Sequence, residues 1–83
     1  PKTSLKKPNY KIGLQIAQMA AAATKNSNPD ILDTLALAQY RNGQKAAAIT
    51  TQTRAVQLAK KQGANPQNLA DMQARLKQFK AGK

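Results

Sequence analysis

Residues 28–58 read NPDILDTLALAQYRNGQKAAAITTQTRAVQL, and this stretch constrains the possible fold more than any other part of the chain. It opens with Asn28-Pro29, a pair typical of a helix start, and apolar residues then recur at three- and four-residue spacing. The pattern breaks at Asn42-Gly43, and a second helical run of similar length follows. These features predict a helical hairpin, a pair of antiparallel helices that usually stacks on others of its kind.

The two helices of the hairpin are expected at residues 29–41 and 44–62. Asp30 and Asp33 lie near the start of the earlier helix, where the helix dipole favours negative charge, so helix starting is their expected role. Gly43 is expected to end that helix in a left-handed conformation. The predicted inner faces are Ile31, Leu32, Leu35, Ala36 and Ala38 or Gln39 on the earlier helix, and Ala48, Ile49, Ala55, Val56, Leu58 and Ala59 on the later one.

A further helix is predicted before the hairpin, from residue 10 to about residue 25. Its apolar residues fall on two adjoining faces, so we expect this helix to have neighbours on two sides. One face holds Leu14, Ala17, Ala20 and Ala21, and the other holds Ile12, Ile16 and Met19.

A last helix is predicted after the hairpin, because Asn65-Pro66 repeats the start signal of Asn28-Pro29. Its apolar stripe is expected to pack in the core. The stripe consists of Leu69, Met72, Leu76 and Phe79. We therefore predict a basic extended arm at residues 1–9, a helical domain at residues 10–80 and a basic tail at residues 81–83.

The hairpin resembles the tetratricopeptide repeat, a two-helix unit of about 34 residues with small residues where the helices cross. The residues that carry the likeness are Leu32, Leu35, Ala36, the turn residue Gly43, and Ala48 and Ala55, which lie seven apart. Gly13 and Ala20 show the same spacing. The resemblance implies an all-α fold, a short right-handed α-solenoid of about four helices, with one full repeat, a preceding half-repeat and a C-terminal capping helix. Gln52 stands where the family usually has a large aromatic residue, which weakens the expected core.

The net charge and the residue composition of the chain limit the functions that it can have. The chain of 83 residues holds 14 Lys and Arg against 3 Asp and Glu, a net charge of +11, which favours acidic partners. It contains no histidine and no cysteine, so the usual nucleophile–base pairs, thiolate metal sites and disulfides are excluded. Its glycines are isolated, and no phosphate-binding loop is present. The sequence therefore predicts a protein that is not an enzyme and needs no cofactor or metal.

The sequence favours a protein–protein interaction module: an adaptor, assembly factor or small accessory subunit docked on a larger, acidic protein complex. The alternative is a small basic protein that binds nucleic acid or associates with the ribosome. Under the first hypothesis the candidate contact residues lie on the arm and on polar positions of the helices. They are Lys6, Lys7, Lys11, Gln39, Tyr40 and Arg54.

The sequence does not determine the cellular compartment of the protein. No run is apolar enough for a transmembrane helix or a signal peptide, which indicates a soluble protein. The chain begins at Pro1 without a methionine, so we expect a processed protein or a fragment, and earlier removal of an export signal is compatible with the sequence.

Overall fold

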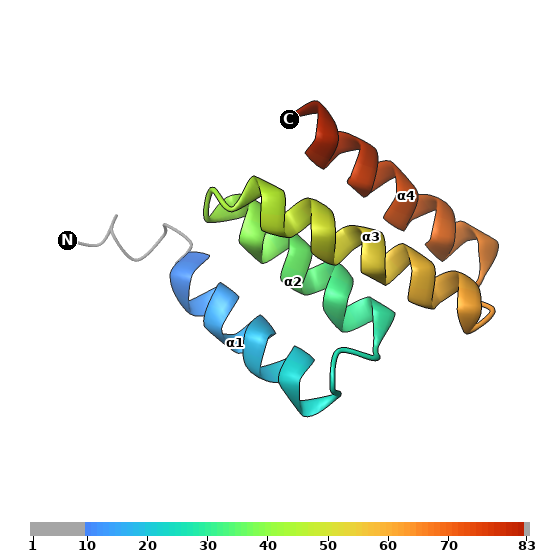
Figure 1. Ribbon diagram of the computed structural model, residues 1–83, viewed down its shortest axis with the longest axis horizontal. Coiled ribbons are helices and arrows are strands. Elements are labelled where there is room, and N and C mark those ends of the chain that lie inside the picture. The colour runs from blue at the N-terminus through green and yellow to red at the C-terminus, as the bar shows by residue number, and fades with distance from the viewer. Residues whose placement is uncertain (1–9, 83) are drawn as a thin grey trace, which may run out of the picture.

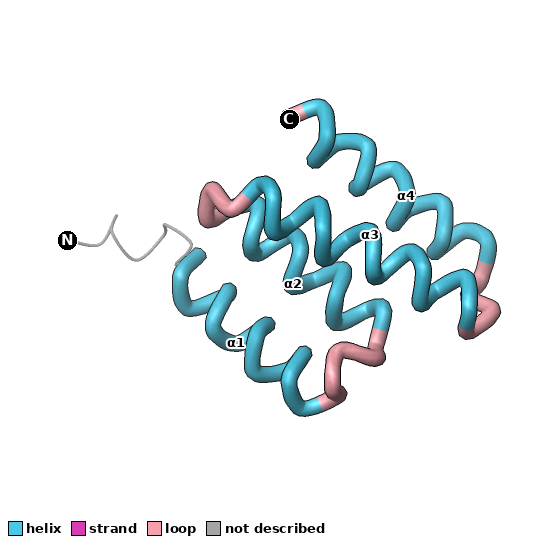
Figure 2. Tube along the Cα trace, in the orientation of Figure 1, coloured by secondary structure: helices cyan, strands magenta, loops and turns pink. Residues whose placement is uncertain are grey.

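Four α-helices make up residues 10–82, the part of the chain that the computed structural model describes. They are α1 (Tyr10–Ala23), α2 (Pro29–Arg41), α3 (Lys45–Lys61) and α4 (Pro66–Ala81), joined by short loops (Figure 1, Figure 2). These residues contain no strand, so the predicted all-α fold is confirmed. The predicted basic arm at residues 1–9 lies outside the described residues.

The hairpin begins and turns as its local sequence predicts. The side chain of Asn28 accepts hydrogen bonds from the backbone N–H groups of Asp30, at 3.0 Å, and Ile31, at 3.3 Å, with Pro29 in the first turn. Gly43 follows α2 with φ of +79°, a left-handed conformation that favours glycine. Asn65 repeats the start motif for α4, where its side chain accepts from the N–H of Gln67 at 2.8 Å.

The first helix ends earlier than predicted, at Ala23 rather than near Lys25. Lys25 and Asn26 both adopt left-handed conformations, with φ of +54° and +58°. The Asn26 N–H donates to the carbonyl of Ala21 at 2.8 Å, which closes the end of α1. These two left-handed residues turn the chain back towards α2 directly after the end of the helix.

The helices pack in chain order. α2 and α3 form the central hairpin, α1 packs against α2, and α4 packs against α3. Figure 1 shows α1 and α4 on opposite sides of this hairpin. Alanines allow the close approach, since Ala36, Ala48, Ala55 and Ala59 are completely buried.

Larger side chains fill three clusters between the helices. The first joins α1 to the hairpin through Leu14, Leu32 and Leu35. Phe79 of α4 packs with alanines of α2 and α3 in the second cluster, and Met72 of α4 packs with Val56 of α3 in the third. Met72 and Phe79 are buried, as the apolar stripe of the last helix predicts.

The prediction that α1 has neighbours on two sides is wrong for the described residues. The face with Leu14, Ala17 and Ala21 is buried, but on the adjoining face Ile16 is 62% exposed and Met19 is 72% exposed. Only α2 packs extensively against α1. An apolar face in the sequence shows that a side chain tolerates burial, and it does not show that the chain itself supplies the cover.

Candidate interaction site

The candidate contact residues come from three helices. Lys11 on α1 and Arg54 on α3 are exposed, whereas Gln39 and Tyr40 on α2 are half-buried. The Tyr40 ring stacks on Phe79, with ring centroids 4.5 Å apart and planes 16° from parallel. Tyr40 therefore takes part in packing inside the chain. Lys6 and Lys7 lie outside the described residues.

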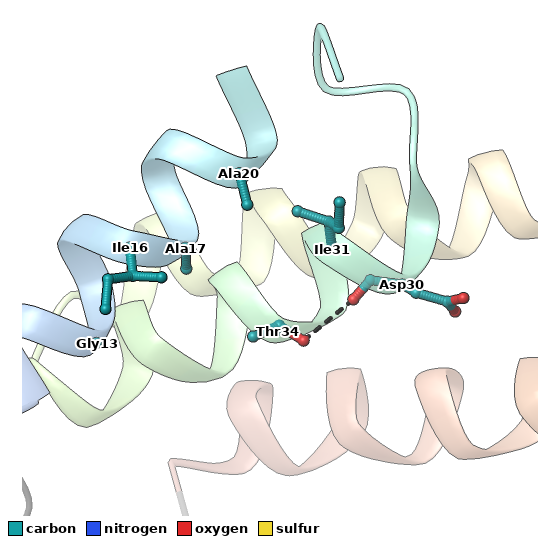
Figure 3. Close-up of a pocket in the computed structure, with 7 residues that line it drawn as sticks. All are labelled: Gly13, Ile16, Ala17, Ala20, Asp30, Ile31 and Thr34. Carbon is teal, nitrogen blue, oxygen red and sulfur yellow. Dashed lines mark hydrogen bonds between the residues drawn. The ribbon is translucent and has the colours of Figure 1, made fainter. Parts of the chain in front are cut away.

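An apolar groove runs between α1 and α2, and sequence reasoning did not predict it. Its volume is about 310 Å³, and Figure 3 shows its lining side chains projecting from the two helices. Asp30 and Thr34 are the polar ones, and the Thr34 hydroxyl donates to the Asp30 carbonyl at 3.2 Å. The lining of this α1–α2 groove comprises Gly13, Ile16, Ala17 and Ala20 from α1, and Asp30, Ile31 and Thr34 from α2.

The groove continues into a stripe of large apolar side chains on α1. Ile12, Ile16 and Met19 follow one another at spacings of four and three residues, so they share one side of the helix. All three are at least half exposed. Ile16 belongs to both features, since it also lines the groove. We call Ile12, Ile16 and Met19 the α1 stripe. Contiguous exposed apolar surface of this kind commonly marks an interaction site.

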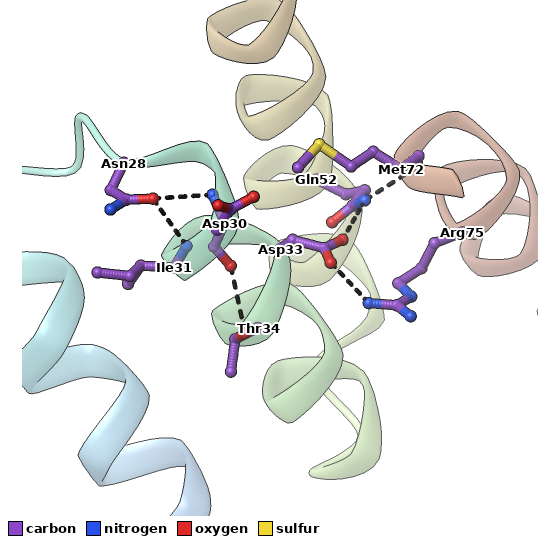
Figure 4. Close-up of polar contacts among 8 residues, drawn as sticks. All are labelled: Asn28, Asp30, Ile31, Asp33, Thr34, Gln52, Met72 and Arg75. Carbon is purple, nitrogen blue, oxygen red and sulfur yellow. Dashed lines mark hydrogen bonds and ion pairs between the residues drawn. The ribbon is translucent and has the colours of Figure 1, made fainter. Parts of the chain in front are cut away.

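A polar cluster joins α2, α3 and α4 on another side of the molecule (Figure 4). The Gln52 side-chain amide donates to the Asp33 carboxylate at 2.7 Å and to the Met72 backbone carbonyl at 2.9 Å. Arg75 forms an ion pair with the other oxygen of Asp33 at 2.8 Å. Gln52 is completely buried, and its Oε1 has no hydrogen-bond partner among the described residues.

Sequence reasoning missed this cluster. It gave Asp33 only a role in helix starting, whereas the carboxylate binds two side chains that follow it by 19 and 42 residues. A signal was present, because Ala48, Gln52, Ala55 and Ala59 share the inner face of α3 by their spacing. A polar residue in such a row is expected to be buried and hydrogen-bonded.

The three acidic residues of the chain lie near this cluster. Asp30, Asp33 and Asp71 line a hollow of about 210 Å³ together with Arg75. Gln52 and Arg75 bind Asp33, and the Gln67 amide donates to Asp71 at 3.5 Å. Within residues 10–82 no three acidic, histidine or cysteine side chains are grouped so that they could hold a metal ion. The hydrogen bonds and the ion pair of the cluster therefore connect α2, α3 and α4.

Arg75→Ala is expected to lower the free energy of unfolding by only about 0.2–1 kcal/mol, because the ion pair is partly exposed to water. The side chains of Arg75 and Asp33 keep 35% and 23% of their accessible surface. Urea unfolding followed by circular dichroism at low and high salt measures the effect, which should shrink as salt screens the pair. Arg54→Ala removes the same charge from an exposed site and is the matched control. If Arg75→Ala lowered the free energy of unfolding by more than about 2 kcal/mol and Arg54→Ala did not, the ion pair would contribute far more than a partly exposed pair is expected to.

Comparison with known proteins finds no family model, no curated protein and no solved structure that matches the chain. The helices of residues 10–82 are also too short or too polar to cross a membrane. A functional proposal for this chain therefore rests on the chemistry of its own surface.

Proposed function

We propose that this chain is a non-catalytic protein–protein interaction module, an adaptor, assembly factor or small accessory subunit that docks on a larger acidic protein complex. The observation that carries the proposal is the α1 stripe, three large apolar side chains exposed beside an apolar groove. It lies on a chain with a net charge of +11. Apolar surface supplies binding energy at short range, and charge raises the rate of encounter with an acidic partner.

The chemistry of the two hollows supports a non-catalytic role. The α1–α2 groove is lined mostly by apolar side chains and carries one carboxylate, Asp30. In the polar cluster, Gln52 and Arg75 already bind the Asp33 carboxylate. A general base must be able to reach a substrate proton, and a nucleophile needs such a base beside it, whereas the Asp33 carboxylate is engaged inside the chain.

We also propose that the hairpin is a tetratricopeptide-like repeat. Ala36, Ala48 and Ala55, at the positions where that family has small residues, are completely buried between helices. Gly43 takes the left-handed conformation expected of the turn glycine. In this interpretation α1 corresponds to the second helix of a preceding repeat, and its exposed face is a surface against which a helix packs in a solenoid.

Isolation of the tagged chain at near-physiological salt, from the cell that makes it, tests the proposal. The expected result is a stable complex with an acidic protein, identified by mass spectrometry and unchanged by nuclease treatment. A free monomer of 8.9 kDa in native mass measurements would contradict an interaction module. A complex that nuclease or moderate salt dissolves would favour the nucleic-acid alternative, because phosphate contacts are strongly salt-dependent.

A further inference from the structure

We infer that the α1–α2 groove and the α1 stripe bind a single amphipathic α-helix from a partner protein, with acidic residues on the faces that stay in solvent. The inference rests on the proposed function and deepens it, because it assigns the surface and the chemistry of its occupant. The candidate contact residues predicted from sequence include none of the residues that line this surface.

The shape of the surface suits a helix. α1 has 14 residues and is about 21 Å long, and the groove lies along it from Gly13 to Ala20. Gly13, Ala17 and Ala20 repeat at spacings of four and three residues, so small residues form the floor of the groove on one side of α1. Ile31 on α2 lines the opposite wall (Figure 3). The exposed side chains of the α1 stripe extend the apolar surface beyond Ile16. Amphipathic helices bind apolar grooves of this kind through residues at helical spacing.

Gly13 gives independent support. Glycine lowers helix stability relative to alanine, yet Gly13 lies inside α1. A Cβ atom built there meets no atom of the chain within 4 Å, so internal packing does not require a glycine at this position. A glycine on the floor of an open groove allows the backbone of a second element to approach closely.

Charge selects an acidic partner helix over a second copy of this chain. The α1 sequence YKIGLQIAQMAAAA contains Lys11 and no acidic residue, α2 adds one carboxylate to the groove lining, Asp30, and each chain as a whole carries +11. Pairing two α1 stripes would bring like charges together, whereas Asp and Glu on the solvent faces of a partner helix would attract this surface.

A synthetic peptide tests the inference on the full 83-residue chain. The probe is a fluorescent helix of about 18 residues, with leucines at three- and four-residue spacing and glutamates on the other faces. Fluorescence anisotropy at near-physiological salt is expected to show saturable binding in the micromolar range. A peptide with lysine in place of each glutamate, and a scrambled peptide without the apolar stripe, are expected to bind at least about tenfold more weakly.

Ile16→Asp is expected to raise the peptide Kd by about 30-fold, because it places a charge in the apolar contact. Gln18→Asp is the matched control: it makes the same charge change at an exposed position of α1 outside both the groove and the α1 stripe, and it should leave the Kd within about threefold. Gly13→Ala should raise the melting temperature and yet weaken peptide binding, a combination that loss of folding cannot produce.

Three results would overturn the inference. One is the absence of saturable peptide binding at concentrations up to about 1 mM. Another is an equal loss of affinity in Ile16→Asp and Gln18→Asp, which would show attraction by charge alone. The third is a dimer in sedimentation that Ile16→Asp dissolves, which would assign the surface to a second copy. If Ile16→Asp keeps its partner in the isolated cellular complex, this docking surface is wrong and the interaction module stands. A free monomer in the cell would instead contradict the module itself.

Discussion

Replacing Phe79 with alanine is expected to lower the free energy of unfolding by about 3–5 kcal/mol. A domain of 83 residues has a total stability of roughly 4–12 kcal/mol, so this single change removes a large part of it. The expected result in urea unfolding is a much lower midpoint, and in thermal unfolding a fall of more than about 12 °C.

The size of the effect follows from the surroundings of the ring. Phe79 is 3% exposed and packs with Ala36 and Ala48, two alanines that are themselves completely buried. Such short side chains cannot extend into the space that the ring leaves, so a cavity remains. The stacking contact with Tyr40 is lost as well, and with it a contact that holds the last turns of α4 to α2.

Controls separate packing from other effects. Phe79→Leu keeps an apolar side chain of similar volume and should cost less than about 1.5 kcal/mol. Gln78→Ala, at the exposed neighbouring position, should change stability by less than about 0.5 kcal/mol. If Phe79→Ala costs less than 1 kcal/mol, then α4 does not depend on this cluster, and its role in covering the hairpin is wrong.

The helices and most of their ends could be predicted from the sequence because the determinants are local. Asn28 caps α2 through backbone groups two and three residues away, and Gly43 needs only its own φ angle to end the turn. The face of α2 that is buried also follows from spacing within one helix, as Leu32, Leu35 and Ala36 show.

The α1–α2 groove and the polar cluster could not be predicted, because their determinants are not local. The groove depends on how α1 and α2 lie against each other, which places Gly13 and Thr34 in the lining of one hollow. The hydrogen bonds of Gln52 join three helices, and the sequence offered only its position in an apolar row. Asp33 lies where the helix dipole favours negative charge, so a helix-starting role accounted for it in the sequence. That role gave no indication of its ion pair with Arg75.

Gln52→Glu is expected to cost about 3–5 kcal/mol at neutral pH, although it changes the shape of the side chain very little. The amide nitrogen of Gln52 now donates to the Asp33 carboxylate and to the Met72 carbonyl (Figure 4). An ionised carboxylate at this completely buried position cannot donate to either acceptor and lies beside a second negative charge. The unfolded chain keeps that carboxylate in water at no such cost.

The loss should depend on pH with a definite sign. Burial beside Asp33 favours the protonated form of the introduced carboxyl in the folded state, whereas in the unfolded chain it ionises near pH 4.3, approximately the value for free glutamate. Stability relative to the parent chain is therefore retained below about pH 4.3 and lost as the pH rises above it. Urea unfolding of both chains at about pH 4 and pH 7 measures the difference.

Gln52→Met is the matched control, because it has a similar shape and removes the amide without adding charge. It leaves the Met72 carbonyl unpaired and Asp33 with Arg75 alone, so a loss of about 1–2 kcal/mol that changes little with pH is expected. Equal losses for the methionine and glutamate variants at neutral pH would show that the lost amide hydrogen bonds account for the whole effect and that the introduced charge adds nothing to it. A larger, pH-dependent loss for glutamate alone would show that this buried position, where α2, α3 and α4 meet, excludes a negative charge beside Asp33.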